Sequence, residues 1–220
     1  MNEMDKILDW NNVRDRIVLS VVNDKSVHED EPRIELPGDL SIVYKILVDS
    51  DEEGTSGFIR FKMNLLRKWQ EQYPPVTEQN FLESIFEVAK ANTERMFRPV
   101  YVKVPEGLVA FNESDFNQNK VEAVSDAFTF GEPKILVVTT DDAINGATVV
   151  FNSYVLSGIA EEYDDDLILV FSSPYECVIH PAHGEFTEST IKASLVSLEE
   201  PPLSEKLYYY NSQTTELTVI

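Results

Sequence analysis

Cysteine and long apolar runs are both scarce in this sequence. Among 220 residues there is one cysteine, Cys177, so no disulfide bond can form within the chain and we expect a reducing compartment. The first residues show no basic start followed by an apolar run, as a secretory signal would. No apolar stretch approaches the roughly 20 residues that a membrane helix needs. These absences predict a cytoplasmic protein.

Basic residues are also few. The chain has 18 lysines and arginines against 39 aspartates and glutamates, a formal net charge of -21. Phosphate backbones and anionic lipids bind to clustered basic side chains, so scattered ones argue against direct binding to nucleic acid or to a membrane surface. The acidity fits a protein partner with a basic surface, a protein that imitates DNA, or simply a device that keeps the chain soluble.

The eight glycines form none of the loops that hold nucleotides. Phosphate-binding loops and dinucleotide fingerprints need several glycines at fixed spacing, and no such spacing occurs. The spacing of zinc fingers is absent as well. We therefore predict no cofactor.

What the sequence does contain is 43% hydrophobic residues spread along its length, enough for a substantial core. Apolar residues repeat every three or four positions, as in helices, at 5–22, 77–97, 153–163 and 187–198, and a short helical piece carries Leu65, Leu66 and Trp69. Apolar, β-branched and aromatic runs predict strands at 40–48, 58–63, 100–104, 134–140, 147–151, 167–171, 176–180, 207–210 and 216–220. Short turns between paired strands predict an α+β fold in which antiparallel β-hairpins form a sheet covered by helices.

Three polar residues have expected structural roles in the predicted helices. Thr77 and Ser153 stand where a hydroxyl can cap the start of a helix. Asn92 lies on the apolar face of the helix predicted at 77–97. An amide in that position is expected to be buried and to make a specific hydrogen bond.

A polar, weakly patterned stretch at 105–133 predicts a connection between an N-terminal half, 1–104, and a C-terminal half, 134–220. One compact domain is the alternative. The runs Gly57–Phe61 and Ala147–Phe151 resemble each other, and each precedes a short helical segment. This resemblance fits a duplicated hairpin-plus-helix unit, and it equally fits chance similarity between apolar strands.

The densest group of metal-binding residue types is His180, His183 and Glu185, preceded by Cys177. Two imidazoles, a carboxylate and a thiolate are suitable zinc ligands. However, Cys177 and His180 are three residues apart, so on a strand they point to opposite faces. A proline and a glycine next to the histidines also prevent the helix that zinc motifs of this kind need. The pattern favours a strand end that leads into a polar turn.

Ser172 and Ser173 lie in the predicted turn before His180, which raises the hypothesis of a hydrolase. No glycine-flanked nucleophile elbow and no glycine-rich oxyanion loop accompany them. Serines are common in turns because they bond to their own backbone. The acidic runs at 141–142 and 164–166 lack the spacing of a calcium-binding loop, so we interpret them as solvated loops.

Several short motifs occur in an order that resembles one bacterial family. They are Ala91–Arg95 with Pro99, Gly146–Val150, Leu156–Glu161, Asp166–Ser173, Val178–Pro181, Tyr208–Tyr210 and Leu217–Ile220. The family is domain-of-unknown-function family fifty-six eighty-eight, found in gut Firmicutes, and the chain is also distantly similar to the uncharacterised YtpQ-like family. The resemblance runs from about Trp10 to the end. It implies a bacterial, cytoplasmic protein and supplies no catalytic residue, ligand or partner.

These observations favour a non-catalytic binding or interaction protein of unknown function. The alternative is a hydrolase or metal-dependent enzyme with a site near Ser172, His180 and His183. A second alternative is an acidic DNA mimic. The aromatic cluster Tyr208–Tyr210 suits a contact surface, and packing within a hairpin explains it equally well.

Overall fold

The computed structural model describes residues 7–49, 56–72, 76–103, 123–124, 135–141, 144–184, 187–196 and 201–220. It divides the chain into two compact units. Unit 1 comprises Met1–Leu36 and Ser41–Met96, and unit 2 comprises Pro37–Leu40 and Phe97–Ile220. The predicted connecting stretch lies outside the described residues, apart from the two residues of strand β6, Ala123–Val124.

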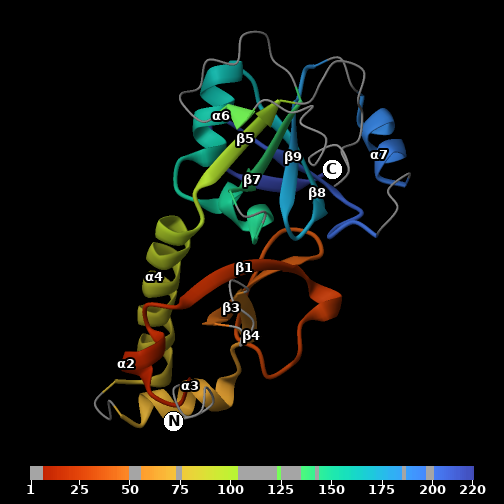
Figure 1. The fold of residues 1–220 in the computed structure, drawn as a ribbon. Helices are drawn as coiled ribbons and strands as arrows, with labels where there is room; N and C mark the ends of the chain where they lie inside the picture. The colour runs from red at the N-terminus through yellow and green to blue at the C-terminus, as the bar shows by residue number, and fades with distance from the viewer. Residues whose placement is uncertain are drawn as a thin grey trace. The chain divides into compact units, whose positions relative to one another are not determined.

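Unit 1 contains a small sheet and the long helix α4 (Figure 1). Its elements are α2 (Trp10–Val13), β1 (Ile17–Asn23), η1 (Asp24–Ser26), β2 (Arg33–Glu35), β3 (Leu40–Asp49), β4 (Ser56–Arg60), α3 (Met63–Gln70) and α4 (Glu78–Met96). The strands follow the order β1-β3-β2, and β4 pairs with β3 as well. The predicted β3–β4 hairpin is confirmed, and so is the predicted short helix α3.

The prediction of one helix over residues 5–22 is wrong. Helix α2 covers only four residues, and Ile17–Asn23 is the strand β1. Six of its seven residues are buried, so both faces of the strand are covered. A strand of this kind shows a continuous apolar run, and its periodicity cannot be told from that of a helix. The β-branched residues of the run favour the strand.

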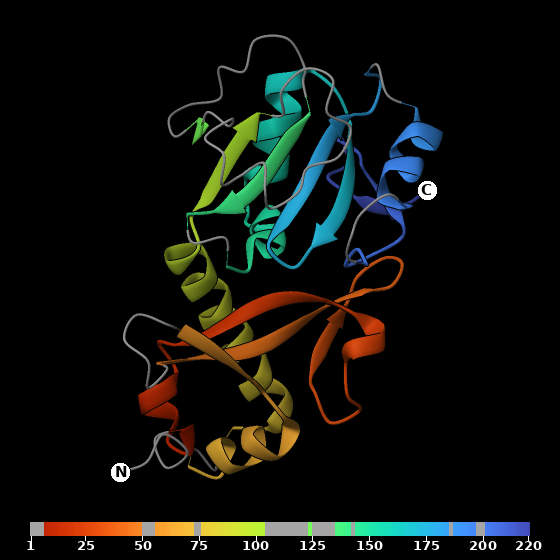
Figure 2. The ribbon, with the colours of Figure 1, turned by 45° about the vertical axis from the view of Figure 1, so that its right-hand side comes forward.

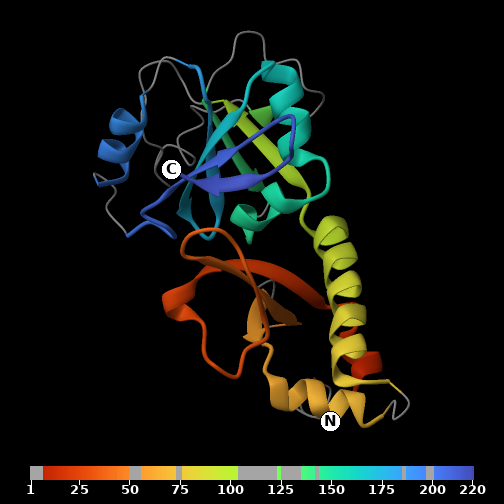
Figure 3. The same ribbon diagram turned by 180° about the vertical axis from the view of Figure 1, so that it is seen from behind.

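The predicted helix at 77–97 is confirmed as α4, with the predicted cap. The Oγ1 atom of Thr77 accepts a hydrogen bond from the backbone N–H of Asn80 at 3.2 Å. Figure 3 shows α4 beside the small sheet of unit 1. The cap satisfies one of the backbone donors that a helix start leaves without an intrahelical partner.

Two side chains of α4 fasten the helix to the edge strand β1. Asn92 donates through its Nδ2 to the carbonyl oxygens of Arg14, at 2.7 Å, and Ile17, at 2.9 Å. The backbone N–H of Leu19 donates to the Oγ1 of Thr93 at 2.8 Å. These bonds satisfy backbone groups that an edge strand would otherwise leave open. The buried amide predicted at Asn92 is confirmed, since the residue is 6% exposed.

Replacing this amide is expected to weaken unit 1. Asn92→Ala leaves the buried carbonyl oxygen of Ile17 and the partly buried one of Arg14 without their donor, which costs about 2 kcal/mol of the free energy of unfolding. Urea denaturation followed by circular dichroism measures the change. Asn80→Ala is the matched control, because Asn80 is exposed on the same helix. An equal loss in both variants would contradict the anchoring role of Asn92.

Unit 2 is built on a seven-stranded antiparallel sheet in the order β11-β10-β8-β9-β7-β5-β6. Besides β6, unit 2 contains β5 (Pro99–Lys103), β7 (Leu136–Thr140), η2 (Gly146–Phe151), α6 (Val155–Tyr163), β8 (Leu167–Ser173), β9 (Glu176–Pro181), α7 (Glu188–Val196), β10 (Leu207–Tyr210) and β11 (Leu217–Val219). Both units combine helices with antiparallel strands. The predicted α+β class is therefore confirmed.

Each face of this sheet has its own covering layer. On one face Val137, Val170 and Val178 pack with Ile191 and Leu195 of α7. On the other face the ring of Phe171 stacks on Phe151 of η2 and meets Tyr208 edge-on. Figures 1 and 2 show α6 and α7 on opposite sides of the sheet. The central strands are therefore buried on both faces.

The strand predicted at 147–151 is a second error, because Gly146–Phe151 forms the 3-10 helix η2. Asn145 precedes it in the left-handed region, at φ 60°. The Oγ1 of Thr148 donates to the Oδ1 of Asn145 at 2.8 Å and holds the turn. The matching run Gly57–Phe61 lies mostly in strand β4, so the structure does not support the duplicated unit.

One smaller prediction is also corrected. Tyr154, and not Ser153, occupies the cap position of α6, and it makes no side-chain cap hydrogen bond. Of the two interpretations of the aromatic cluster, the structure supports packing and not an exposed contact surface, because Tyr208 and Tyr210 are buried. The Tyr208 hydroxyl donates to Asp39 at 2.8 Å, which accounts for its burial as a polar side chain.

Candidate functional site

The serine candidates lie at the end of strand β8 and not in the turn, which is formed by Pro174 and Tyr175. The Oγ of Ser172 donates to the Oε1 of Glu176 at 2.8 Å. The Oγ of Ser173 accepts from the backbone N–H of Tyr175 at 3.1 Å. Both hydroxyls therefore bond within the hairpin, and neither contacts a histidine.

His180 lies at the other end of the same hairpin. It pairs with Ile168, whereas Ser173 pairs with Glu176. Four residues along a strand span about 13 Å, so the serines and this imidazole do not converge. His180 is 1% exposed, and burial lowers its pKa to about 4. It is a neutral core side chain at physiological pH.

His183 follows β9 and is oriented by a carboxylate. Its Nδ1 lies 2.6 Å from the Oδ1 of Asp165, and its backbone N–H donates to the Oδ2 of the same residue at 2.9 Å. The carboxylate raises the pKa of His183. The imidazole is exposed, with 80% of its side-chain surface open to solvent. A histidine oriented by an aspartate is the general-base dyad of a catalytic triad, and Asp165 with His183 has this arrangement.

A cavity of about 410 Å³ lies beside His183, but its other polar groups are engaged in structural bonds. The Oγ1 of Thr187 lies 2.8 Å from the Oγ of Ser189 and accepts from the backbone N–H of Thr190 at the start of α7. The Tyr209 hydroxyl donates to Asp166. No serine or cysteine is among the described residues that line the cavity. The dyad therefore has no nucleophile next to it there.

The residues proposed as metal ligands are separated. His180 is buried in the core and His183 is exposed, while Glu185 lies outside the described residues. Within the part of the chain that the structure describes, no three acidic, histidine or cysteine side chains are grouped closely enough to hold a metal ion. Cys177 is fully buried, and burial raises the pKa of its thiol, so it is unreactive.

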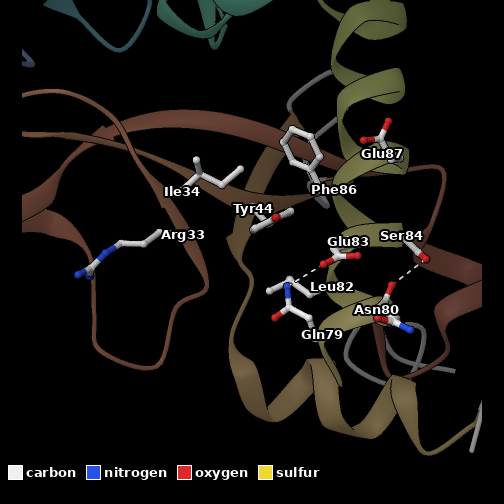
Figure 4. A pocket seen from close by; sticks show the side chains of 10 residues that line it. All are labelled: Arg33, Ile34, Tyr44, Gln79, Asn80, Leu82, Glu83, Ser84, Phe86 and Glu87. Atoms are coloured by element: carbon white, nitrogen blue, oxygen red, sulfur yellow. Dashed lines mark hydrogen bonds between the residues drawn. The ribbon is translucent and has the colours of Figure 1, made fainter. Parts of the chain in front are cut away.

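The larger candidate site is a groove of about 690 Å³ in unit 1, which we call the α4 groove (Figure 4). Strands β2 and β3 supply one wall and α4 supplies the other. It is lined by Arg33, Ile34, Tyr44, Gln79, Asn80, Leu82, Glu83, Ser84, Phe86 and Glu87.

The helix wall of the groove has two stripes, because residues four apart lie above one another on a helix. Leu82 and Phe86 form an apolar stripe and are only half-buried. Glu83 and Glu87 form the neighbouring acidic stripe and are exposed. Gln79 continues this stripe, and its Nε2 donates to the Oε1 of Glu83 at 2.8 Å. The groove therefore combines an apolar wall with a negatively charged rim.

Tyr44 lies in the strand wall, between Ile34 and the helix (Figure 4). It is 3% exposed, and its ring meets Phe61 edge-on. Burial raises the pKa of Tyr44 to about 12, so the hydroxyl stays protonated and can donate a hydrogen bond. No described residue makes a hydrogen bond with this hydroxyl. A hydroxyl in the groove wall that no described residue engages suits a ligand that brings an acceptor.

The sequence held part of the signal for the α4 groove. Phe81, Ile85 and Asn92 mark the face of α4 that packs in the core. Leu82 and Phe86 form a second apolar stripe beside it, more than a single packed face requires. The contribution of Tyr44 could not be predicted from the sequence, because it depends on how β3 is placed against α4.

The comparisons with known proteins identify a family and no activity. Residues 1–212 match the Family of unknown function (DUF5688). The chain belongs to this family. No curated protein and no solved structure matches it. The segments that resembled the family in the sequence now have structural roles: Asn92 and Thr93 fasten α4 to β1, and Gly146 begins η2.

None of the helices in the described ranges is both long and apolar enough to cross a membrane.

Proposed function

We propose that this member of the DUF5688 family is a non-catalytic binding protein whose α4 groove holds a segment of a protein partner. The segment carries a large apolar side chain next to a lysine or arginine. The observation that carries the proposal is the pairing of an apolar wall with two carboxylates one helical turn apart. The net charge of -21 favours a basic partner.

The apolar wall can supply affinity. Leu82, Phe86 and Ile34 are half-buried, so an apolar side chain placed between them removes further surface from water. Fully burying a leucine or phenylalanine side chain contributes about 1.5–3 kcal/mol. The Tyr44 hydroxyl can donate to a backbone carbonyl of the bound segment, which adds about 1 kcal/mol.

The rim supports the preference for a basic segment. Glu83 and Glu87 are exposed and lie along the same edge of the groove. Arg33 is the one basic residue among the lining residues that the structure describes, and its guanidinium lies 3.4 Å from the carboxylate of Glu35. Figure 4 shows the Arg33 side chain directed away from α4. Opposite charges on the groove rim and on the bound segment increase the association rate and select between partners.

The rival functions have less support. An enzyme centred on Ser172, His180 and His183 would need these side chains to meet, but Ser172 and His180 lie at opposite ends of one hairpin. A DNA mimic would present carboxylates spaced like phosphates and would need no apolar groove. We also propose that the protein is bacterial and cytoplasmic, on the basis of the sequence resemblance.

A random dodecapeptide library, selected by display on the immobilised full chain, tests the proposed function. We expect the enriched peptides to carry a large apolar residue beside lysine or arginine. Their affinity is expected to fall at least about tenfold for Glu83→Lys with Glu87→Lys, because attraction to the rim becomes repulsion. Fluorescence anisotropy of labelled peptides at two salt concentrations measures this change.

The control variant is Glu161→Lys with Glu216→Lys, which makes the same change of charge at exposed positions of unit 2. It should bind the peptides as the wild type does. Tyr44→Phe should weaken binding about fivefold without lowering stability, because its hydroxyl has no bond to lose. Enrichment of peptides without basic residues, or equal binding to both charge-reversed variants, would refute the proposed function.

A further inference from the structure

Two basic side chains lie directly opposite each other in the sheet of unit 1. Lys45 of β3 pairs with Arg60 of β4 in the antiparallel register. Like charges in this position destabilise a sheet. Strand β3 also pairs with β2, through Ser41–Val43, and with β1, whose sequence from Ile17 to Asn23 has no titratable side chain. Lys45 therefore gains no compensating charge from β1.

Glu31, the carboxylate that acts on Lys45, pairs with the arginine through one of its two oxygens. The Nη1 of Arg60 donates to the Oε2 of Glu31 at 2.9 Å and to the carbonyl oxygen of Ser26 at 2.6 Å. The Glu31 side chain is 1% exposed and the Arg60 side chain 33%, so this ion pair is partly buried. Among the described residues, none forms an ion pair with Lys45. Its Nζ lies 5.2 Å from the centre of the Phe58 ring instead.

This environment disfavours the charged form of the lysine. Partial burial and the nearby Arg60 lower the pKa of Lys45 to about 8, and Glu31 opposes the shift only partly. At pH 7.5 about one amine in four is then neutral, against about one in a thousand for a lysine with the ordinary pKa of about 10.4. The neutral amine is the nucleophilic form of lysine.

We propose that Lys45 is a site of acylation by small acyl phosphates. The lone pair of the neutral Nζ attacks the acyl carbon and forms a carbon–nitrogen bond. The bond between that carbon and the phosphate oxygen breaks, and its electron pair leaves with phosphate. The extra proton on nitrogen goes to solvent. The product is a neutral amide.

Acylation has a structural advantage at this position. It removes the positive charge that faces Arg60 and leaves the ion pair of Arg60 with Glu31 intact. The charge of the cluster made by Lys45, Arg60 and Glu31 falls from +1 to zero. The modification therefore acts as a charge switch on this face of β3. This inference does not depend on the proposed peptide-binding function.

Acetylation of the full chain by acetyl phosphate, followed peptide by peptide with mass spectrometry, tests the proposal. Lys68 is the internal control, since it is exposed on α3. At pH 7.5 we expect Lys45 to be acetylated about tenfold faster than Lys68. Its rate should level off above a midpoint near pH 8.

A single variant, Arg60→Gln, tests the contribution of the guanidinium. Arg60 lowers the pKa of Lys45 and Glu31 raises it, so removing Arg60 alone should slow the acetylation of Lys45 at pH 7.5, while burial keeps part of the shift. A thermal melt checks that the variant is folded. If the variant is unfolded, the pH profile of Lys45 acetylation in the wild type is sufficient to test the proposal. Equal rates for Lys45 and Lys68 at pH 7.5, or a rate for Lys45 that keeps rising well above pH 8, would overturn the proposal.

Discussion

Gly146→Ala is expected to destabilise unit 2 by about 3 kcal/mol or more, so that much of the variant is unfolded or insoluble. A Cβ added at Gly146 would lie 1.8 Å from the carbonyl oxygen of Tyr175 and 2.7 Å from its carbonyl carbon. No heavy atoms approach so closely without a bond. The clash is with backbone, so no side-chain rotation can relieve it.

The backbone around Gly146 is also held in place. The Oγ1 of Thr139 donates to the carbonyl oxygen of Tyr175 at 2.7 Å. The backbone N–H of Ala147 donates to the carbonyl oxygen of Pro174 at 3.2 Å. A shift large enough to admit a methyl group would lengthen or break both bonds. The close approach of η2 to the β8–β9 turn therefore requires glycine at position 146.

Gly57→Ala is the control for this prediction. A Cβ at Gly57 would meet the Cγ2 of Val48 at 3.5 Å, an ordinary contact. We expect the stability of this variant to stay within about 1 kcal/mol of the wild type. Urea denaturation followed by circular dichroism compares the two variants. Equal unfolding midpoints would show that the backbone near Gly146 is free to move.

The sequence was most informative where one face of an element meets water. Helix α4 alternates between a buried face, which includes Ile85 and Ala89, and exposed positions such as Glu83 and Glu87. Its period, cap and length could therefore be predicted. The β8–β9 hairpin could also be predicted, because Pro174 and Tyr175 separate two apolar runs.

The errors have a common cause. The segments at 17–22 and 146–150 are buried on all sides, so no exposed polar position reveals their period. Strand and 3-10 helix are then decided by contacts with distant residues. One such contact is the bond between the backbone of Leu19 and Thr93. Another is the bond between the backbone of Ala147 and Pro174.

The candidate site shows the same limit. Ser172, His180 and His183 are near in sequence, but the strand geometry separates them. The α4 groove unites segments about 40 residues apart, since Tyr44 faces Leu82 and Phe86 (Figure 4). Residue types on one segment can suggest one wall of a groove. Only the fold supplies the other wall.

Lowering the pH is expected to destabilise unit 2, because His180 takes up a proton more readily in the unfolded chain than in the folded one. In the folded state burial holds its pKa at about 4, whereas an unfolded histidine titrates near 6.5. Above pH 6.5 the imidazole is neutral in both states, and its contribution to stability is fully present. As the pH falls from 6.5 towards 4, only the unfolded chain binds the proton. Stability then falls by about 1.4 kcal/mol for each pH unit, about 3 kcal/mol in total.

Comparison of the wild type with His180→Gln isolates this effect, because the carboxylates titrate in both proteins. Urea denaturation at pH 6.5 and pH 5 should show a loss about 2 kcal/mol larger in the wild type. His183→Gln is the control. The pKa of His183 is raised in the folded state, so its contribution is present below pH 6.5 and is lost as the pH rises through its folded pKa. Removing His183 should not reduce the loss of stability between pH 6.5 and pH 5. Equal losses in the wild type and His180→Gln would mean that His180 is accessible to protons in the folded protein.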